Sequence, residues 1–186
     1  RDIIKPKLLW MRSFHNIYNP EMAIEVVLNL IKIYPDEELT MAGKDKGLLN
    51  KIKALVKKYN LDKYVNFVGF LDMEEKQIEF AKHDIFINTS RIDNMPVSLL
   101  EAASSGLLIV STNIGGIPYI FQHRKTALLV ENNDVIGMVN SIRQLIEEPK
   151  LAESLSINAR KLVEDYSWHK LKLQWEDLFK NYCSNV

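Results

Sequence analysis

The chain has 186 residues, 47% apolar and 26% charged, and its 24 Lys and Arg residues balance 24 Asp and Glu residues. This is the composition of an ordinary globular protein that can bury a core without disulfides or metals, and the zero net charge argues against a nucleic-acid binder. The single cysteine, Cys183, excludes an internal disulfide framework and suits a reducing cytoplasm, and no apolar run approaches the ~18 residues of a membrane span.

Six short apolar runs alternate with amphipathic segments along the chain. Each run is rich in branched or aromatic residues and is followed by polar or glycine-bearing turns, which is typical of strands buried on both faces of a sheet. The predicted strands are residues 7–11, 38–42, 64–70, 84–89, 107–111 and 127–131.

Apolar residues between these runs recur at helical spacing, with Pro20 and Asp134 as helix starts and Pro35, Gly106 and Pro149 at or near helix ends. The clearest helical patterns span residues 23–34, 48–59 and 135–146. Strand–helix alternation through six units predicts an α/β fold, namely a doubly wound, Rossmann-like, six-stranded parallel sheet with helices on both faces.

Beyond Pro149 the pattern predicts two helices without a strand, at about 150–165 and 167–182. The second helix carries an apolar stripe, and two interpretations of it stay open: it packs back on its own domain, or it covers a partner domain absent from this chain. The stripe consists of Trp168, Leu171, Trp175, Leu178, Phe179 and Tyr182.

Open parallel sheets bind ligands at the carboxyl ends of their strands, near the switch in strand order. Several familiar site motifs are absent from this sequence, including G-x-G-x-x-G, the P-loop, a Cys/His zinc cluster and the G-x-S-x-G elbow. The informative segments are therefore those that follow the predicted strands, at 12–14, 43–45, 69–72, 89–95 and 112–118.

One of these segments, NTSRIDNMPVSLLEAASSG at 88–106, combines several useful features. Pro96 suits the first turn of a helix that continues through Val97 and ends near Gly106. The free amides at the start of this helix predict an anion site, and a diphosphate is the obvious anion. Arg12, at the end of the first strand, offers a planar fork suited to phosphate.

Two acids flank this helix start. Glu101, about one turn in, is placed to accept hydrogen bonds from a ribose diol, and Asp93 is placed to accept them from sugar hydroxyls. Gly115 and Gly116 would allow another loop to approach a ligand closely. Asp93 alone is equally well explained as a helix cap, and Arg12 alone as an ion-pair residue, but together with Glu101 they favour a site.

These residues resemble a known family. D-x7-E in DNMPVSLLE, followed by AASSG and VSTNIGGIP, resembles the signature of glycosyltransferase family four, and WMRSFHNIYNP, ELTMAGKD, VNFVGFLD and DIFINTS fall in the expected order. The resemblance covers essentially the whole chain. It implies the C-terminal, donor-binding half of the two-domain glycosyltransferase B fold. The implied reaction transfers a sugar, with retention of configuration, from a UDP- or GDP-linked donor to a glycan or lipid, without a cofactor or metal.

The resemblance also implies roles for individual residues. Arg12 would contact the donor diphosphate, Asp93 would face the transferred sugar and Glu101 would hold the ribose, and these three are the implied catalytic residues. The backbone from Met95 to Leu99 would contact sugar and phosphate, and the turn at 70–71 would border the base. The full implied donor-binding set is Arg12, Gly43, Lys44, Phe70, Leu71, Asp93, Asn94, Met95, Pro96, Val97, Ser98, Leu99, Glu101, Gly115 and Gly116.

The sequence departs from the family pattern at three places. Asp93 stands where Glu is usual, and Tyr119 replaces the glutamate after GG-x-P. The lysine that normally follows the arginine is missing, with Tyr18 in that region. Lys44 and Lys46 are the candidates to replace its charge.

We expect residues 1–166 to form the donor-binding domain and 167–186 to form a C-terminal helix. Packing of this helix on the absent N-terminal acceptor domain is one of the two interpretations left open above. The chain begins with Arg1 rather than Met, which indicates a piece of a longer protein, and this half is expected to have little or no activity alone. The expected location is the cytoplasm, with peripheral association at the inner membrane face as an alternative for the full-length protein. A sugar-nucleotide epimerase of the same fold and a catalytically inactive nucleotide-sugar-binding domain stay open as other functions.

Overall fold

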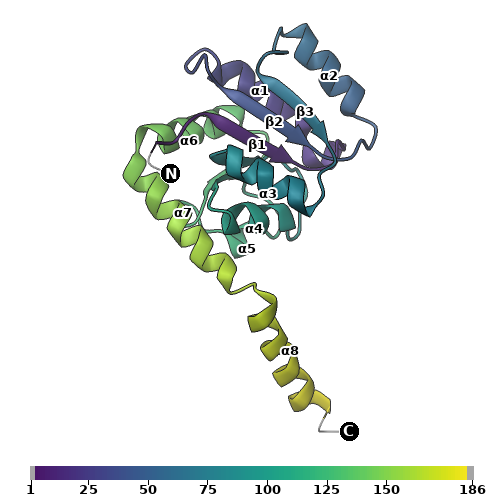
Figure 1. The fold of residues 1–186 in the computed structure, drawn as a ribbon, viewed down its shortest axis with the longest axis vertical. Coiled ribbons are helices and arrows are strands. Elements are labelled where there is room, and N and C mark those ends of the chain that lie inside the picture. The colour runs from purple at the N-terminus through teal and green to yellow at the C-terminus, as the bar shows by residue number, and fades with distance from the viewer. Residues whose placement is uncertain (1–2, 184–186) are drawn as a thin grey trace.

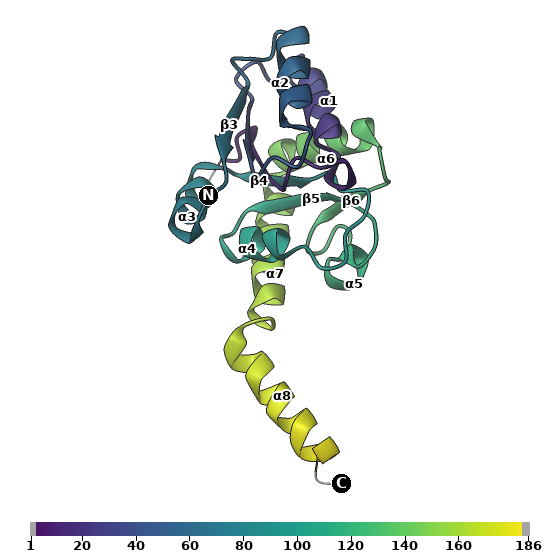
Figure 2. The same cartoon turned by 90° about the vertical axis from the view of Figure 1, so that its right-hand side faces the viewer.

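The structure, a computed structural model, describes residues 3–183. Six parallel strands form one sheet in the order β3-β2-β1-β4-β5-β6, and helices cover both of its faces (Figure 2). The predicted α/β fold and all six predicted strands are confirmed. The strands are β1 Lys7–Met11, β2 Glu38–Ala42, β3 Val65–Gly69, β4 Ile85–Asn88, β5 Leu108–Thr112 and β6 Leu128–Val130.

The helices divide between the two faces of the sheet (Figures 1 and 2). One face carries α1 Pro20–Leu30, α2 Leu49–Lys58 and α6 Val135–Glu147. The other carries α3 Met73–Lys82, α4 Val97–Ser104, α5 Ile117–Ile120 and α7 Pro149–Glu164. A short 3-10 helix, η1 Asn16–Tyr18, precedes α1, and α8 Trp168–Cys183 follows α7.

The central strand β1 shows why its apolar run is continuous. Leu8 and Trp10 belong to the hydrophobic core beneath α1, α2 and α6, whereas Leu9 and Met11 belong to the core beneath α4, α5 and α7. Successive side chains of a strand point to opposite faces, so a sheet covered on both faces needs apolar residues at every position.

Strand β3 departs from the prediction that every strand is buried on both faces. Of its five residues only Val65 is buried, and Val68 is 40% exposed. The reason is its position, because β3 lies at the edge of the sheet and pairs only with β2.

Two helices, α3 and α5, have no counterpart among the predicted helical patterns. Only Glu79 and Phe80 are buried in α3, so its apolar periodicity is weak. Its start does carry a signal in the form of a capping box: the Glu75 amide donates to Asp72 Oδ1, and the Asp72 amide donates to Glu75 Oε2, both at 2.9 Å. The four residues of α5 are too few for any periodic pattern.

The two C-terminal helices lie where the sequence predicts them, but α8 extends away from the sheet and its covering helices (Figures 1 and 2). Trp168 is 73% exposed and Trp175 is 52% exposed. The interpretation in which this stripe packs back on its own domain is therefore wrong, because the turn after α7 directs α8 away from both cores. The interpretation that it covers a partner domain stays a prediction.

Candidate functional site

The strand order reverses between β1 and β4, which is the switch point where open α/β sheets bind ligands. A cavity of about 360 Å³ lies beside this point, at the carboxyl ends of the strands. Its walls come from the segments that follow β1, β2 and β3 and from the first turns of α3 and α4. The lining residues are Met11, Arg12, Ser13, Tyr18, Ala42, Gly43, Lys44, Phe70, Leu71, Lys76, Val97, Ser98 and Glu101.

A larger cavity, of about 490 Å³, lies at the opposite edge of the sheet. Asp84, just before β4, and Leu108, at the start of β5, line it, so it opens at the amino ends of the strands. Ligands of open α/β sheets bind at the carboxyl ends. We therefore assign the candidate site to the smaller cavity at the switch point.

Just over half of the predicted donor-binding residues line this cavity, namely Arg12, Gly43, Lys44, Phe70, Leu71, Val97, Ser98 and Glu101. The remainder lie outside its lining: Asp93, Asn94, Met95, Pro96, Leu99, Gly115 and Gly116. Leu99 cannot contact a ligand in this cavity as predicted, because its side chain is buried in the core and its N–H donates to the Pro96 carbonyl at 3.0 Å. Of the two candidate replacement lysines, Lys44 lines the cavity and Lys46 does not.

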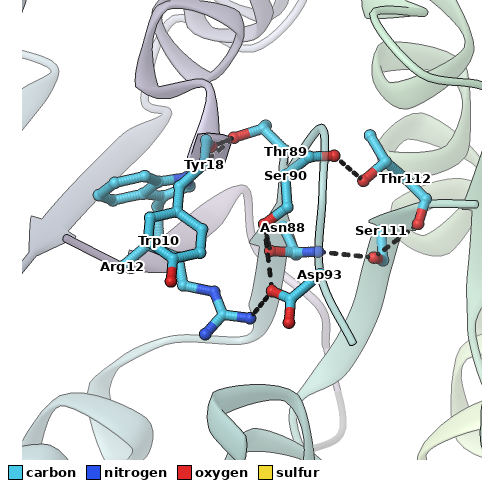
Figure 3. Close-up of polar contacts among 9 residues, drawn as sticks. All are labelled: Trp10, Arg12, Tyr18, Asn88, Thr89, Ser90, Asp93, Ser111 and Thr112. Atoms are coloured by element: carbon cyan, nitrogen blue, oxygen red, sulfur yellow. Dashed lines mark hydrogen bonds and ion pairs between the residues drawn. The ribbon is translucent and has the colours of Figure 1, made fainter. Parts of the chain in front are cut away.

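Arg12 and Asp93 form an ion pair between Nη2 and Oδ2 (Figure 3). Arg12 follows β1 and Asp93 lies in the loop after β4, so the pairing of these two strands brings the charges together. Burial lowers the pKa of the Arg12 guanidinium, whereas the Asp93 carboxylate raises it, and arginine stays charged at neutral pH. Arg12 Nε is buried and has no hydrogen-bond partner among the described residues, so this guanidinium keeps an unused donor.

Buried hydrogen bonds hold the loop that carries Asp93 (Figure 3). Trp10 Nε1 donates to Thr89 Oγ1 at 2.9 Å, and Thr112 Oγ1 donates to the Ser90 carbonyl at 2.7 Å. The Ser90 hydroxyl itself lies 3.4 Å from Asp93 Oδ2. Because Trp10 is on β1 and Thr112 is on β5, these bonds tie the loop to the strands on both sides of β4.

Gly115 and Gly116 let a second loop pack against the same segment. A Cβ on Gly115, whose φ is +53°, would lie 1.9 Å from the Asp93 carbonyl oxygen, and one on Gly116 would lie 1.8 Å from that of Asn94. The Gly116 N–H donates to the Asp93 carbonyl at 3.1 Å. The close approach seen here is thus between two loops, and the predicted contact of these glycines with a ligand stays a prediction.

Helix α4 begins at Val97, and Pro96 precedes it with φ −72° and ψ 101°. The prediction that Pro96 lies in the first helical turn is therefore wrong by one residue, because its extended backbone makes it the N-cap. No side chain caps this helix start. The Ser98 hydroxyl lines the cavity, is buried and has no partner among the described residues. An uncapped helix start beside unused donors on Ser98 and Arg12 is suited to bind an anion.

Glu101 pairs with Lys76, a residue that no sequence pattern singled out. Lys76 Nζ lies 2.9 Å from Oε1 and 3.1 Å from Oε2 of Glu101. On another wall of the cavity, Lys44 Nζ lies 4.4 Å from the centroid of the Phe70 ring and forms no ion pair among the described residues. The cavity therefore has one ammonium group that no carboxylate neutralises, which favours an anionic ligand.

Metal and membrane features are also absent from the part of the chain that the structure describes. No group of three or more His, Cys, Asp or Glu there is arranged to hold a metal ion. Within residues 3–183 no helix combines the length and apolar character needed to cross a membrane. The expectation of a metal-independent reaction stays a prediction.

Sequence comparison finds relatives along most of the chain. The family model described as "Glycosyl transferases group 1" matches residues 4–162. The N-acetyl-alpha-D-glucosaminyl L-malate synthase of Bacillus anthracis is 30% identical over 173 residues, which make up 92% of this chain and 44% of that protein. The chain spans less than half the length of the curated relatives it matches.

Comparison of structures shows the same fold in two solved proteins. A variant of TarM from S. aureus, solved in complex with UDP, fondaparinux and alpha-GlcNAc-glycerol, has a TM-score of 0.86 at 22% identity, covering 96% of this chain and 36% of that one. The C-terminal domain of a glycosyl transferase group 1 family protein from Francisella tularensis has a TM-score of 0.77 at 24% identity, covering 87% and 86%.

Proposed function

The chain belongs to the glycosyl transferases of group 1, and on that premise we propose that it is the donor-binding half of a retaining enzyme that uses a nucleotide-sugar. Its fold is that of one half of the two-domain glycosyltransferase B architecture. The acceptor, a glycan or a lipid, is assigned to a second domain outside this chain.

The observation that carries this proposal is the anion site at the start of α4. Ser98 and Arg12 present buried donors without partners at an uncapped helix N-terminus, and a diphosphate would supply the missing acceptors. Glu101 follows Ser98 by three residues, so it lies on the same face about 4.5 Å further along the helix axis. A diphosphate held at Ser98 therefore leaves an attached ribose beside Glu101.

The ion pair of Arg12 with Asp93 fits the chemistry of the donor. In a nucleotide-sugar the anomeric carbon is bonded directly to a diphosphate oxygen, so a group that binds the sugar must lie beside one that binds phosphate. Arg12 and the α4 amides would stabilise the charge that develops on the departing diphosphate, while Asp93 would orient the sugar. No protein nucleophile is required for this role.

Two further observations support a nucleotide-linked donor without a metal. TarM, which shares this fold, was solved with UDP. Arg12 and Lys44 bring positive side chains to the cavity, and these would bind the negative charge of a diphosphate. An epimerase of the same fold is less well supported, because Asp93 and Glu101 are both engaged in ion pairs and neither is a free general base.

Binding of UDP and GDP to the chain, measured by calorimetry, tests the proposal. We expect Glu101→Ala to weaken binding of the preferred nucleotide about tenfold or more, because the ribose loses a charge-assisted acceptor. Glu25→Ala, which removes an exposed carboxylate from α1, is the matched control and should bind like the wild type. Absence of binding to both nucleotides, or equal affinity in the Glu101→Ala variant, would contradict the proposal.

A further inference from the structure

We propose that Lys76 is a positioning residue of this site, which holds the Glu101 carboxylate in the orientation that accepts the ribose hydroxyls. This inference rests on the proposed function, because it assumes that a nucleotide occupies the cavity. Neither the apolar periodicity nor the family resemblance points to Lys76. Its role follows from its contact with Glu101 inside the cavity.

The geometry of the pair fixes the plane of the carboxylate. Lys76 Nζ is close to both Glu101 oxygens, at 2.9 and 3.1 Å, so rotation of the carboxylate would lengthen one of these contacts. Each carboxylate oxygen accepts about two hydrogen bonds, so an acceptor position on each stays available. The side chains of Lys76 and Glu101 are 25% and 32% exposed, and a ligand in the cavity can reach them.

The start of α3 holds Lys76 in place for this contact. The capping box of Asp72 and Glu75 closes the first turn, and the Lys76 amide donates to the Asp72 carbonyl at 3.0 Å. A lysine this close to a helix N-terminus is opposed by the helix dipole. The Glu101 carboxylate offsets that cost, so local helix preference does not account for the lysine.

Lys76 and Lys44 both line the cavity, but they differ in their ion pairing. Lys76 is engaged by both oxygens of Glu101, whereas Lys44 forms no ion pair among the described residues. The diphosphate is therefore assigned to Arg12, Ser98 and Lys44, and Lys76 acts through Glu101 on the ribose.

Calorimetry with two probes tests this role. The first probe is UDP, or GDP if the chain prefers it, and the second is the same diphosphate with 2′,3′-dideoxyribose, which lacks the diol. We expect Lys76→Met to weaken binding of the first probe about five- to twentyfold and to leave binding of the dideoxy probe unchanged. Lys76→Arg should restore most of the affinity, and in a Glu101→Gln background Lys76→Met should have no further effect.

Three results would overturn the inference. An equal loss for both probes would place Lys76 on the diphosphate or give it a structural role, and tighter binding by Lys76→Met would make the ion pair a competitor of the ligand. A loss that persists in full in the Glu101→Gln background would show that Lys76 does not act through Glu101. Each of these leaves the proposed function intact, whereas wild-type protein that binds neither UDP nor GDP would overturn both. Thermal unfolding of the unliganded variants confirms that they are folded.

Discussion

At the scale of single residues, two of the four described side chains that carry a buried polar atom without a partner line the candidate site. These atoms are Ser98 Oγ and Arg12 Nε, and each unpaired buried group costs roughly 1–3 kcal/mol. A ligand at the start of α4 would satisfy them. Two further side chains with such atoms lie outside the cavity lining. Glu21 Oε2, on α1, is one, and the other is Glu37, in the turn before β2, where neither carboxylate oxygen has a hydrogen-bond partner among the described residues.

Glu37 should make the stability of the protein depend on pH. It is 3% exposed, and burial raises its pKa to about 9, whereas in the unfolded chain it titrates near ~4.3. Between these values the folded state keeps a proton that the unfolded state has lost. The free energy of unfolding therefore falls as the pH rises from about 4.5 toward 9.

Glu37→Gln should remove this dependence, because the amide has no proton to lose. We expect the variant to be more stable than the wild type by about 1–3 kcal/mol at pH 8, with little difference at pH 4.5. Urea unfolding at both values measures this. Asp36→Asn, at the exposed neighbouring position, is the control. If the free energy of unfolding of Glu37→Gln changes with pH as much as that of the wild type, the idea is wrong.

At the scale of elements, two loops and one helix decide how the site is built. The loop after β4 carries Asp93, and the loop after β5 packs against it through Gly115 and Gly116. Helix α4 begins where the first loop ends, so the acid and the anion site are held by one continuous segment. A change in the second loop should therefore weaken binding of the sugar, near Asp93, more than binding of the nucleotide.

Gly116→Ala tests this arrangement. Its Cβ would lie 1.8 Å from the Asn94 carbonyl oxygen, so the two loops must separate, at a cost of about 1–3 kcal/mol. We expect binding of the nucleotide-sugar to weaken more than binding of the free nucleotide, as measured by calorimetry. Glu25→Ala, at an exposed position of α1, is the control, and equal losses for the two ligands would argue against the link between this loop and Asp93.

Helix α8 exposes most of its large apolar side chains, namely Trp168, Leu173, Trp175, Leu178, Phe179 and Tyr182. Trp175 and Phe179 stack with ring centroids 5.7 Å apart, yet both are more than half exposed. Replacing both with Ala should change the free energy of unfolding by less than about 0.5 kcal/mol. Leu155→Ala in α7, which removes a buried side chain, should cost about 2–5 kcal/mol. Urea unfolding compares them, and a loss above about 1 kcal/mol for the α8 variant would show that the helix packs on the domain.

At the scale of the whole molecule, the two cores beneath the sheet are complete without α8. Helices α1, α2 and α6 close one core together with the first half of α7, and α3, α4, α5 and the second half of α7 close the other. The candidate site lies at the edge of this layered body, where the loops after three strands meet α3 and α4. The chain covers less than half the length of the curated relatives it matches. Under the proposed function, the acceptor would approach the site from this edge.

The sequence by itself determined the fold class and most of the cavity wall. Continuous apolar runs located the strands, because a sheet covered on both faces requires them. The residues after those strands included Arg12, Lys44 and Phe70, because parallel strands bring their carboxyl ends to one edge.

Only the tertiary structure decided which charges meet. Lys76 reaches Glu101 from a helix whose weak apolar pattern left it unpredicted, and Asp93 meets Arg12 across 81 positions of sequence. Periodicity reports which face of an element is buried, but it carries no information on which side chains of distant segments lie within hydrogen-bond distance. The same limit explains α8, whose apolar stripe is visible in the sequence although the direction in which it leaves α7 is not.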